Sequence, residues 1–118
     1  MLDHIGLTVS DYERSCRFYE EALAPLGYKK VMDFGEVAGF GAQGPTFWIA
    51  RGDGSTPIHV AFTSPDRDTV HAFHAAALAA GGTENGAPGL RTQYHPTYYG
   101  AFVLDPDGNN IEAVCHTP

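Results

Sequence analysis

Two histidines and one glutamate lie in short segments in which apolar residues alternate with polar or small ones. His4 opens "HIGLTV", His59 opens "HVAFT", and Glu112 is the third residue of "NIEAVCH". Two neutral imidazole nitrogens and one carboxylate oxygen suit a hard-to-borderline divalent metal and leave coordination positions open for substrate or water. We therefore take these three residues as candidate metal ligands.

Whether the three side chains can meet depends on the strand faces that carry them. Side chains alternate between the two faces of a strand, and the apolar set is expected to meet a helix. This set consists of Ile5, Leu7 and Val9, of Ile58, Val60 and Phe62, and of Ile111, Ala113 and Cys115. His4, His59 and Glu112 have the opposite parity. We expect them on the helix-free side of the sheet, in a concave pocket or an interface.

The sequence contains an internal repeat. "HIGLTVSDYERSCRFYEEALAPLGY" aligns without a gap to "HVAFTSPDRDTVHAFHAAALAAGGT", at an offset of 55 residues, the difference between positions 59 and 4. The chain is therefore interpreted as one domain built from two modules, about 1–54 and about 55–118. A lone strand histidine is more often a hydrogen-bonded pocket residue than a ligand, but His4 and His59 occupy equivalent positions. That equivalence favours the metal site.

Each module has the pattern β-α-β-β-β. The first helix should begin at "SDYE", a capping-box pattern with Ser10 or Asp11 as N-cap and Glu13 reaching back, and should end before Gly27. The second should begin near Asp66. Strand patterns follow the helices at 29–35, 37–42 and 46–51, and at 83–85, 99–105 and 110–116. A long loop rich in glycine and proline separates 83–85 from 99–105.

A fourth ligand is missing at the position that the repeat would assign to it. The second module has nine more residues between its helix and its last strand than the first, and with this allowance the first-module equivalent of Glu112 is Trp48, so an aromatic wall replaces a carboxylate there. We expect Trp48, Tyr98, Tyr99 and His116 to line a substrate pocket. The loop residues Arg91, Tyr94 and His95 suit the pocket mouth as well as they suit an ordinary surface loop, and we assign no role to His71 and His74 on the second helix.

Composition excludes some classes of partner. The chain has 7 basic and 14 acidic residues and a net charge of −7, which argues against nucleic acid. No apolar run approaches the ~20 residues of a membrane span, and the first strand-like run starts at Leu2, which leaves no room for a signal peptide. Cys16 and Cys115 lie in apolar patterns, and we expect buried free thiols in a reducing cytoplasm.

Three segments, "DHIGLTVSD", "HVAF" and "AFVLDPDGNNIE", resemble the vicinal-oxygen-chelate superfamily. This superfamily includes glyoxalase I, bleomycin-resistance proteins, fosfomycin-resistance enzymes and extradiol dioxygenases. The resemblance implies an α+β fold, in which tandem βαβββ modules form a cupped eight-stranded mixed sheet with helices on the outer face. It also implies a homodimer with a divalent metal (Fe, Mn, Ni or Zn) held by His4, His59 and Glu112. Pairing of modules within one chain and across the dimer both remain open.

Two functions follow from this resemblance. The first is a metal-dependent enzyme acting on a small substrate with vicinal oxygens, by lyase, isomerase, transferase or dioxygenase chemistry. The second is a metal-free small-molecule-binding protein of the bleomycin-resistance type. Trp48 stands where glyoxalase I supplies a second glutamate for proton transfer, which counts against glyoxalase activity. Gly6 stands where fosfomycin-resistance enzymes usually carry a threonine, which counts against fosfomycin-resistance activity. The retained histidines favour the enzyme.

Overall fold

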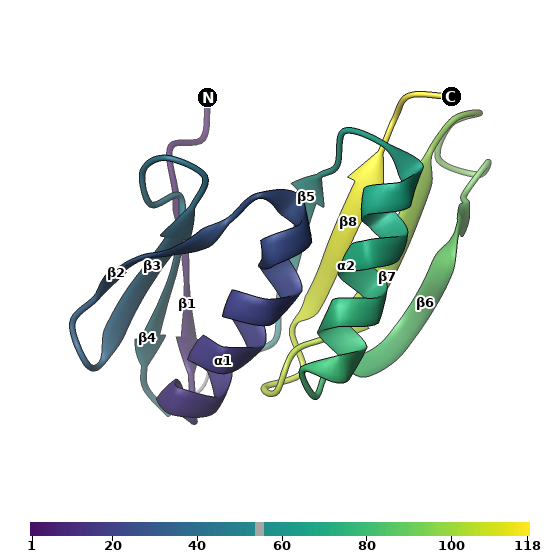
Figure 1. The fold of residues 1–118 in the computed structure, drawn as a ribbon. Helices are drawn as coiled ribbons and strands as arrows, with labels where there is room; N and C mark the ends of the chain where they lie inside the picture. The colour runs from purple at the N-terminus through teal and green to yellow at the C-terminus, as the bar shows by residue number, and fades with distance from the viewer. Residues whose placement is uncertain (54–55) are drawn as a thin grey trace.

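The computed structural model describes residues 1–53 and 56–118 (Figure 1). Its first module comprises β1 (Ile5–Val9), α1 (Tyr12–Leu23), a 3-10 helix (Ala24–Leu26), β2 (Lys29–Asp33), β3 (Val37–Gly41) and β4 (Phe47–Arg51). The second comprises β5 (His59–Thr63), α2 (Arg67–Ala79), β6 (Thr83–Leu90), β7 (Tyr99–Leu104) and β8 (Asn110–Cys115). The predicted βαβββ succession is confirmed in both. The predicted boundary between modules, at 54 and 55, lies outside the described residues.

The eight strands form two four-stranded mixed sheets, ordered β1-β4-β3-β2 and β5-β8-β7-β6. In each sheet the first strand pairs in parallel with the last, and the other pairs are antiparallel. The α+β class is confirmed. Among the described residues no strand of one sheet pairs with a strand of the other, so β1 and β5 are both edge strands. Figure 1 shows α1 and α2 next to each other, with α2 covering one face of the second sheet.

Strand parity agrees with the sequence prediction. Leu7 and Val9 are buried toward α1, whereas Gly6 and Thr8 are exposed on the other face of β1. In β5, Val60 is buried and its neighbours are exposed. Aromatic side chains fill much of the space between helices and sheets: Phe18, Tyr19, Phe40, Phe47, Phe62 and Phe73. Each sheet therefore has one face against a helix and one helix-free face.

The helix starts follow the expected capping residues, with one difference. The Asp11 side chain accepts a hydrogen bond from the Arg14 backbone N–H, and Asp66 caps α2 in the same way. Glu13 does not complete a capping box, since its carboxylate pairs with Arg51 on β4 at 3.0 Å. β6 runs five residues beyond the predicted strand, from Thr83 to Leu90, and shows two register irregularities around a positive-φ glycine.

The turn before β8 is fastened to the first module. Asp105 is 4% exposed and accepts hydrogen bonds from the Tyr19 hydroxyl of α1 at 2.5 Å and from the backbone N–H groups of Asp107 and Asn109. Burial, with the neighbouring Asp105 charge, raises the pKa of Tyr19 well above its usual value. Ser10 donates from its backbone and its hydroxyl to Asp107. These bonds fix the start of the strand that carries Glu112.

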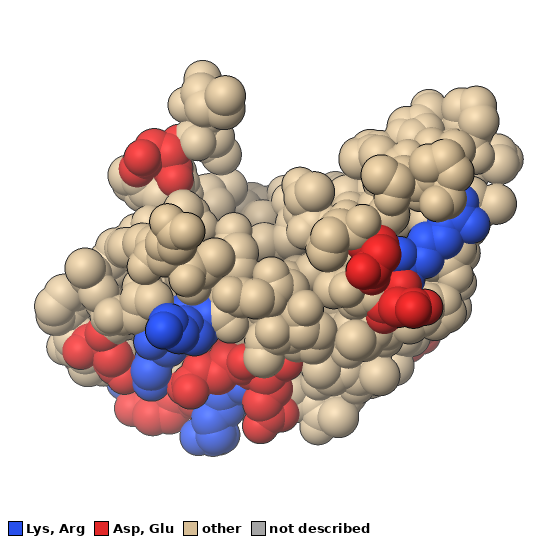
Figure 2. Space-filling model, turned by 45° about the horizontal axis from the view of Figure 1, so that its top comes forward, with Lys and Arg blue, Asp and Glu red and all other residues tan. Residues whose placement is uncertain are grey.

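Charged side chains of both signs are mixed on the surface shown in Figure 2. Lys30 forms ion pairs with Glu20 at 3.1 Å and with Asp33 at 2.9 Å. The same view shows a hollow between the two lobes of the molecule. Among the described residues, no helix is long and apolar enough to cross a membrane.

Candidate functional site

Glu112 is a buried carboxylate on the helix-free face of the second sheet. Its side chain is 1% exposed, and its Oε1 lies 2.8 Å from Nε2 of His59, whose side chain is 50% exposed. In the ladder between β5 and β8, Glu112 is paired with Ala61, two residues from His59. The two side chains therefore share one face, as their parity predicts. An imidazole nitrogen and a carboxylate oxygen meet there at the mouth of a pocket.

Tyr98 engages the other oxygen of Glu112. Its hydroxyl donates a hydrogen bond to Oε2. Burial, followed by this hydrogen bond, raises the pKa of Tyr98 above its usual value. Gly100 on β7 makes room for the pair, because a Cβ there would lie 3.1 Å from Glu112 Oε2 and 3.3 Å from Tyr98 Cε1. Both carboxylate oxygens are thus held in fixed directions, one toward His59 and one toward Tyr98.

Aromatic side chains surround this carboxylate. A cavity of about 330 Å³ is lined by His59, Tyr94, Tyr98, Phe102 and Glu112. Phe102 is paired with Glu112 in the ladder between β7 and β8, so the two lie side by side on the same face. Sequence reasoning missed Phe102. The antiparallel register across the "DPDGNN" turn could have found it, since that turn sets which residue of the preceding strand lies beside Glu112.

His95 and His116 support the rim of this pocket. His95 Nε2 and His116 Nδ1 are 2.5 Å apart, and both rings lie edge-on to the Tyr98 ring, with centroid distances of 5.5 and 5.3 Å. The Thr97 backbone N–H donates to His95 Nδ1 at 3.1 Å, which assigns the proton of neutral His95 to Nε2. His116 thus borders Tyr98 and is not among the residues that line the cavity.

Tyr99 lies on the opposite face, and its predicted pocket role is wrong. Its hydroxyl is hydrogen-bonded to His71 of α2 at 2.7 Å, and the Arg67 guanidinium stacks 4.7 Å above its ring centroid. Tyr99 is paired with Cys115, which the parity argument had already assigned to the helix side. Neighbouring residues of one strand cannot both face the pocket. The same contact gives His71, left without a role in the sequence, a structural one.

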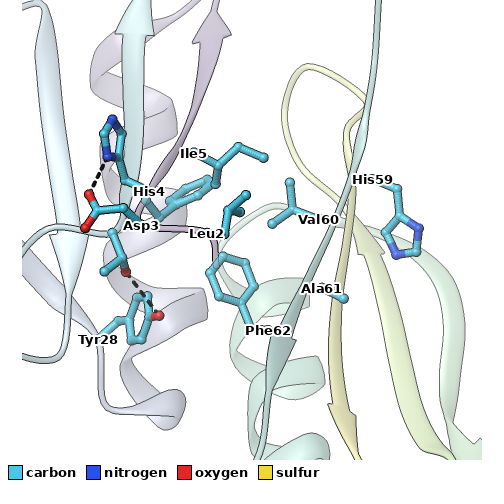
Figure 3. Close-up of a pocket in the computed structure, with 11 residues that line it drawn as sticks. Leu2, Asp3, His4, Ile5, Tyr28, His59, Val60, Ala61 and Phe62 are labelled. Atoms are coloured by element: carbon cyan, nitrogen blue, oxygen red, sulfur yellow. Dashed lines mark hydrogen bonds and ion pairs between the residues drawn. The ribbon is translucent and has the colours of Figure 1, made fainter.

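His4 lies apart from the other two candidate ligands. Its Nδ1 is 2.7 Å from Asp3 Oδ2, and its side chain is 58% exposed. Figure 3 shows the rings of His4 and His59 on opposite sides of the space between the modules, pointing away from each other. Within the described part of the chain, no group of three or more His, Cys, Asp or Glu side chains could hold a metal. One chain brings together His59 and Glu112, and does not bring His4 to them.

The space between the modules is a second cavity, of about 450 Å³. Its lining comes from the N-terminal segment and β1 on one side and from β5 on the other (Figure 3). Ile5 and Val60 point into it, while His59 turns toward the opposite side of β5. This cavity differs from the pocket at Glu112, although His59 lines both.

Trp48 occupies the first-module counterpart of the Glu112 position. It is paired with Gly6 in the ladder between β1 and β4, as Glu112 is paired with Ala61 in the second sheet. The Trp48 ring lies over Gly39, where a Cβ would come within 3.0 Å of it. The side chain is half-buried on the helix-free face of its own sheet. The repeat equivalence that the sequence predicts for Trp48 is confirmed by these registers.

Comparison with known proteins agrees with this arrangement. The family model described as "Glyoxalase/Bleomycin resistance protein/Dioxygenase superfamily" matches residues 1–113. The chain belongs to this superfamily. Among solved structures, a glyoxalase/bleomycin resistance protein from Albidiferax ferrireducens is 31% identical, with 98% of each chain covered and a TM-score of 0.81. No curated protein sequence matches the chain.

Other members of the superfamily share the fold at lower identity. The fosfomycin resistance protein FosX from Mesorhizobium loti is 20% identical over 99% of this chain and 92% of its own, with a TM-score of 0.74. FosX from Listeria monocytogenes is 19% identical over 99% of this chain and 93% of its own, with a TM-score of 0.76. These two likenesses concern the fold alone.

Proposed function

We propose that the protein is a divalent-metal-dependent enzyme that acts on a small substrate with vicinal oxygens. The observation that carries this proposal is the Glu112 carboxylate, 1% exposed and 2.8 Å from His59 Nε2 on the helix-free face. Burying an anion is costly unless a cation or several hydrogen bonds compensate its charge. Tyr98 donates a hydrogen bond but carries no positive charge, and His59 carries one only when it is protonated, so a bound divalent cation suits this position.

The residues present fit such an ion only in part within one chain. His59 and Glu112 supply a nitrogen and an oxygen ligand, and His4 is the third candidate on the other module. We propose that His4 of a second copy completes the set in a homodimer. β1 and β5 are edge strands, and Gly6 on β1 and Ala61 on β5 are exposed on the helix-free faces. A two-fold dimer would produce two equal sites, because each copy would give His4 to one and receive it at the other.

The side chains around Glu112 have separate tasks in this proposal. Tyr98 holds Oε2, which leaves Oε1 directed toward His59 and an ion. Tyr94 and Phe102 form walls that exclude water from the substrate. A divalent ion bound there would polarise the substrate oxygens and stabilise a developing negative charge. Trp48 offers no carboxylate base at the position equivalent to Glu112, so we assign no proton transfer to that position.

A metal-free binding protein is the second candidate function. It is favoured by the contacts of Glu112 in the single chain, because Tyr98 and His59 already satisfy both carboxylate oxygens. In this reading His59 would be protonated and would itself be the compensating cation. The aromatic pocket would then take up a small aromatic or cationic molecule without any chemical change.

Metal analysis of the purified protein separates the two functions, and a complementation experiment tests the shared site. We expect His4→Ala and Glu112→Gln each to abolish metal binding as homodimers. When the two variants are co-expressed, each mixed dimer would carry one site with both substitutions and one intact site. Mixed dimers should therefore bind half the metal of the wild type. The control variant His74→Ala on α2 should bind metal fully. No recovery in the mixed dimers would contradict the shared site.

A further inference from the structure

Arg91 lies on the same helix-free face as Glu112, beyond Phe102. Its guanidinium carbon is 5.4 Å from the centroid of the Phe102 ring. It also lies against two glycines of β6, since a Cβ at Gly86 or Gly89 would come within 3.2 Å of its terminal nitrogens. Side chains at those glycines would displace it. The backbone of β6 thus gives the guanidinium a flat surface beside the aromatic wall of the pocket.

The hydrogen-bonding capacity of Arg91 is mostly unused. Nη2 donates to the Ala87 carbonyl at 2.8 Å, and no carboxylate pairs with Arg91 in the described part of the chain. A guanidinium has five N–H donors in a planar fork that matches a carboxylate.

We propose that the pocket takes an aromatic carboxylate. The ring would lie on Phe102 between Tyr94 and Tyr98, and the carboxylate would pair with Arg91. The end of the ligand that reacts would lie beside His59 and Glu112, and in this last respect the inference rests on the proposed function. A cavity of about 330 Å³ has room for a single substituted ring.

The charges on the two sides of Phe102 set the orientation of such a ligand. Glu112 repels an anion on the β8 side of Phe102. Arg91 lies outside the cavity lining and attracts an anion on the β6 side. A neutral aromatic compound would cover the guanidinium without pairing with it, which lowers its affinity. An aromatic ammonium ion would prefer the opposite orientation, toward Glu112, and binding of that ion is the competing outcome.

The test uses phenylacetate, with phenylacetamide as a neutral compound of the same shape, acetate as an anion without a ring, and benzylamine as a cation. Each is titrated into the full-length protein and followed by the NMR signals of the Tyr, Phe and His rings. We expect phenylacetate to bind at least about tenfold more tightly than phenylacetamide and benzylamine, because only a carboxylate can form a bidentate ion pair with the Arg91 guanidinium. Acetate should not shift the aromatic signals. Arg91→Gln should remove the preference for phenylacetate, and Arg14→Gln, at an exposed position of α1, should keep it.

Repeating the titrations with Mn²⁺ or Zn²⁺ present separates this inference from the proposed function. If a metal stabilises the protein but phenylacetate binds no better than phenylacetamide, the inference is overturned and the metal-dependent function stands. If phenylacetate is preferred through Arg91 and no metal binds, the ligand class is supported and the metal-dependent function fails. Tighter binding of benzylamine, or an unchanged phenylacetate affinity in a folded Arg91→Gln variant, also overturns the inference.

Discussion

Replacing Tyr98 with Phe removes one hydroxyl from a buried carboxylate and leaves the ring in place. Tyr98 donates to Oε2 of Glu112, whose side chain is 1% exposed. A hydrogen bond to a charged group contributes about 1.5–3 kcal/mol. Because Tyr98 is only partly buried, water can replace some of this interaction, and we expect a loss of about 1.5 kcal/mol. For a domain of this size that corresponds to a fall in Tm of roughly 5–9 °C.

Thermal unfolding followed by circular dichroism, without added metal, measures this loss. The matched control is Tyr94→Phe, because Tyr94 lines the same pocket and its hydroxyl makes no hydrogen bond within the described structure. Its Tm should change by less than about 2 °C. In a Glu112→Gln background the cost of Tyr98→Phe should fall by about half, since the acceptor is then neutral. Equal effects of Tyr98→Phe and Tyr94→Phe would refute the assigned role of Tyr98.

Three further predictions concern other positions. Gly100→Ala should weaken metal-dependent stabilisation by crowding Glu112 Oε2, while metal-free stability changes by less than about 1 kcal/mol; an undiminished metal-induced rise in Tm would contradict this. The fluorescence of Trp48, the single tryptophan, should change when a chelator removes bound metal, and an unchanged spectrum would count against its place near the shared site. Hydrogen bonding, chiefly from Tyr12, lowers the pKa of Asp33 below its usual value, so its stabilisation is present above about pH 4 and lost as pH falls; Asp33→Asn should reduce the acid sensitivity of unfolding measured from pH 7 to pH 2.

The sequence predicted those features that depend on local pattern and on the repeat. Strand parity placed His59 and Glu112 on one helix-free face, and the offset between modules identified Trp48 as the counterpart of Glu112. The first deduction uses only alternation along strands, and the second uses the offset between modules together with the nine extra residues in the long loop of the second module. The error at Tyr99 came from treating two adjacent aromatic residues as one cluster, although alternation assigns them to opposite faces.

Features that depend on contacts between distant segments were beyond the sequence. Glu13 could be read as a capping residue, but Arg51, 38 positions away, takes its carboxylate. The separation of His4 from His59 depends on how the two modules pack, which no local pattern encodes. Likewise, the place of Arg91 beside Phe102 depends on the register of β6, which extends further than its glycine-rich sequence suggests.

The central claim is that Glu112 is a metal ligand, and melting curves with Mn²⁺, Fe²⁺, Ni²⁺ and Zn²⁺ test it most directly. An ion that binds only the folded state stabilises it by about 2.7 kcal/mol at a hundredfold excess over its dissociation constant. At least one ion should therefore raise the wild-type Tm by roughly 8–15 °C. Glu112→Gln should lose that rise and be at least as stable as the wild type without metal, whereas Glu21→Gln, at an exposed position of α1, should keep it. If none of the four ions raises the wild-type Tm, Glu112 is not a ligand and the metal-free binding function takes its place.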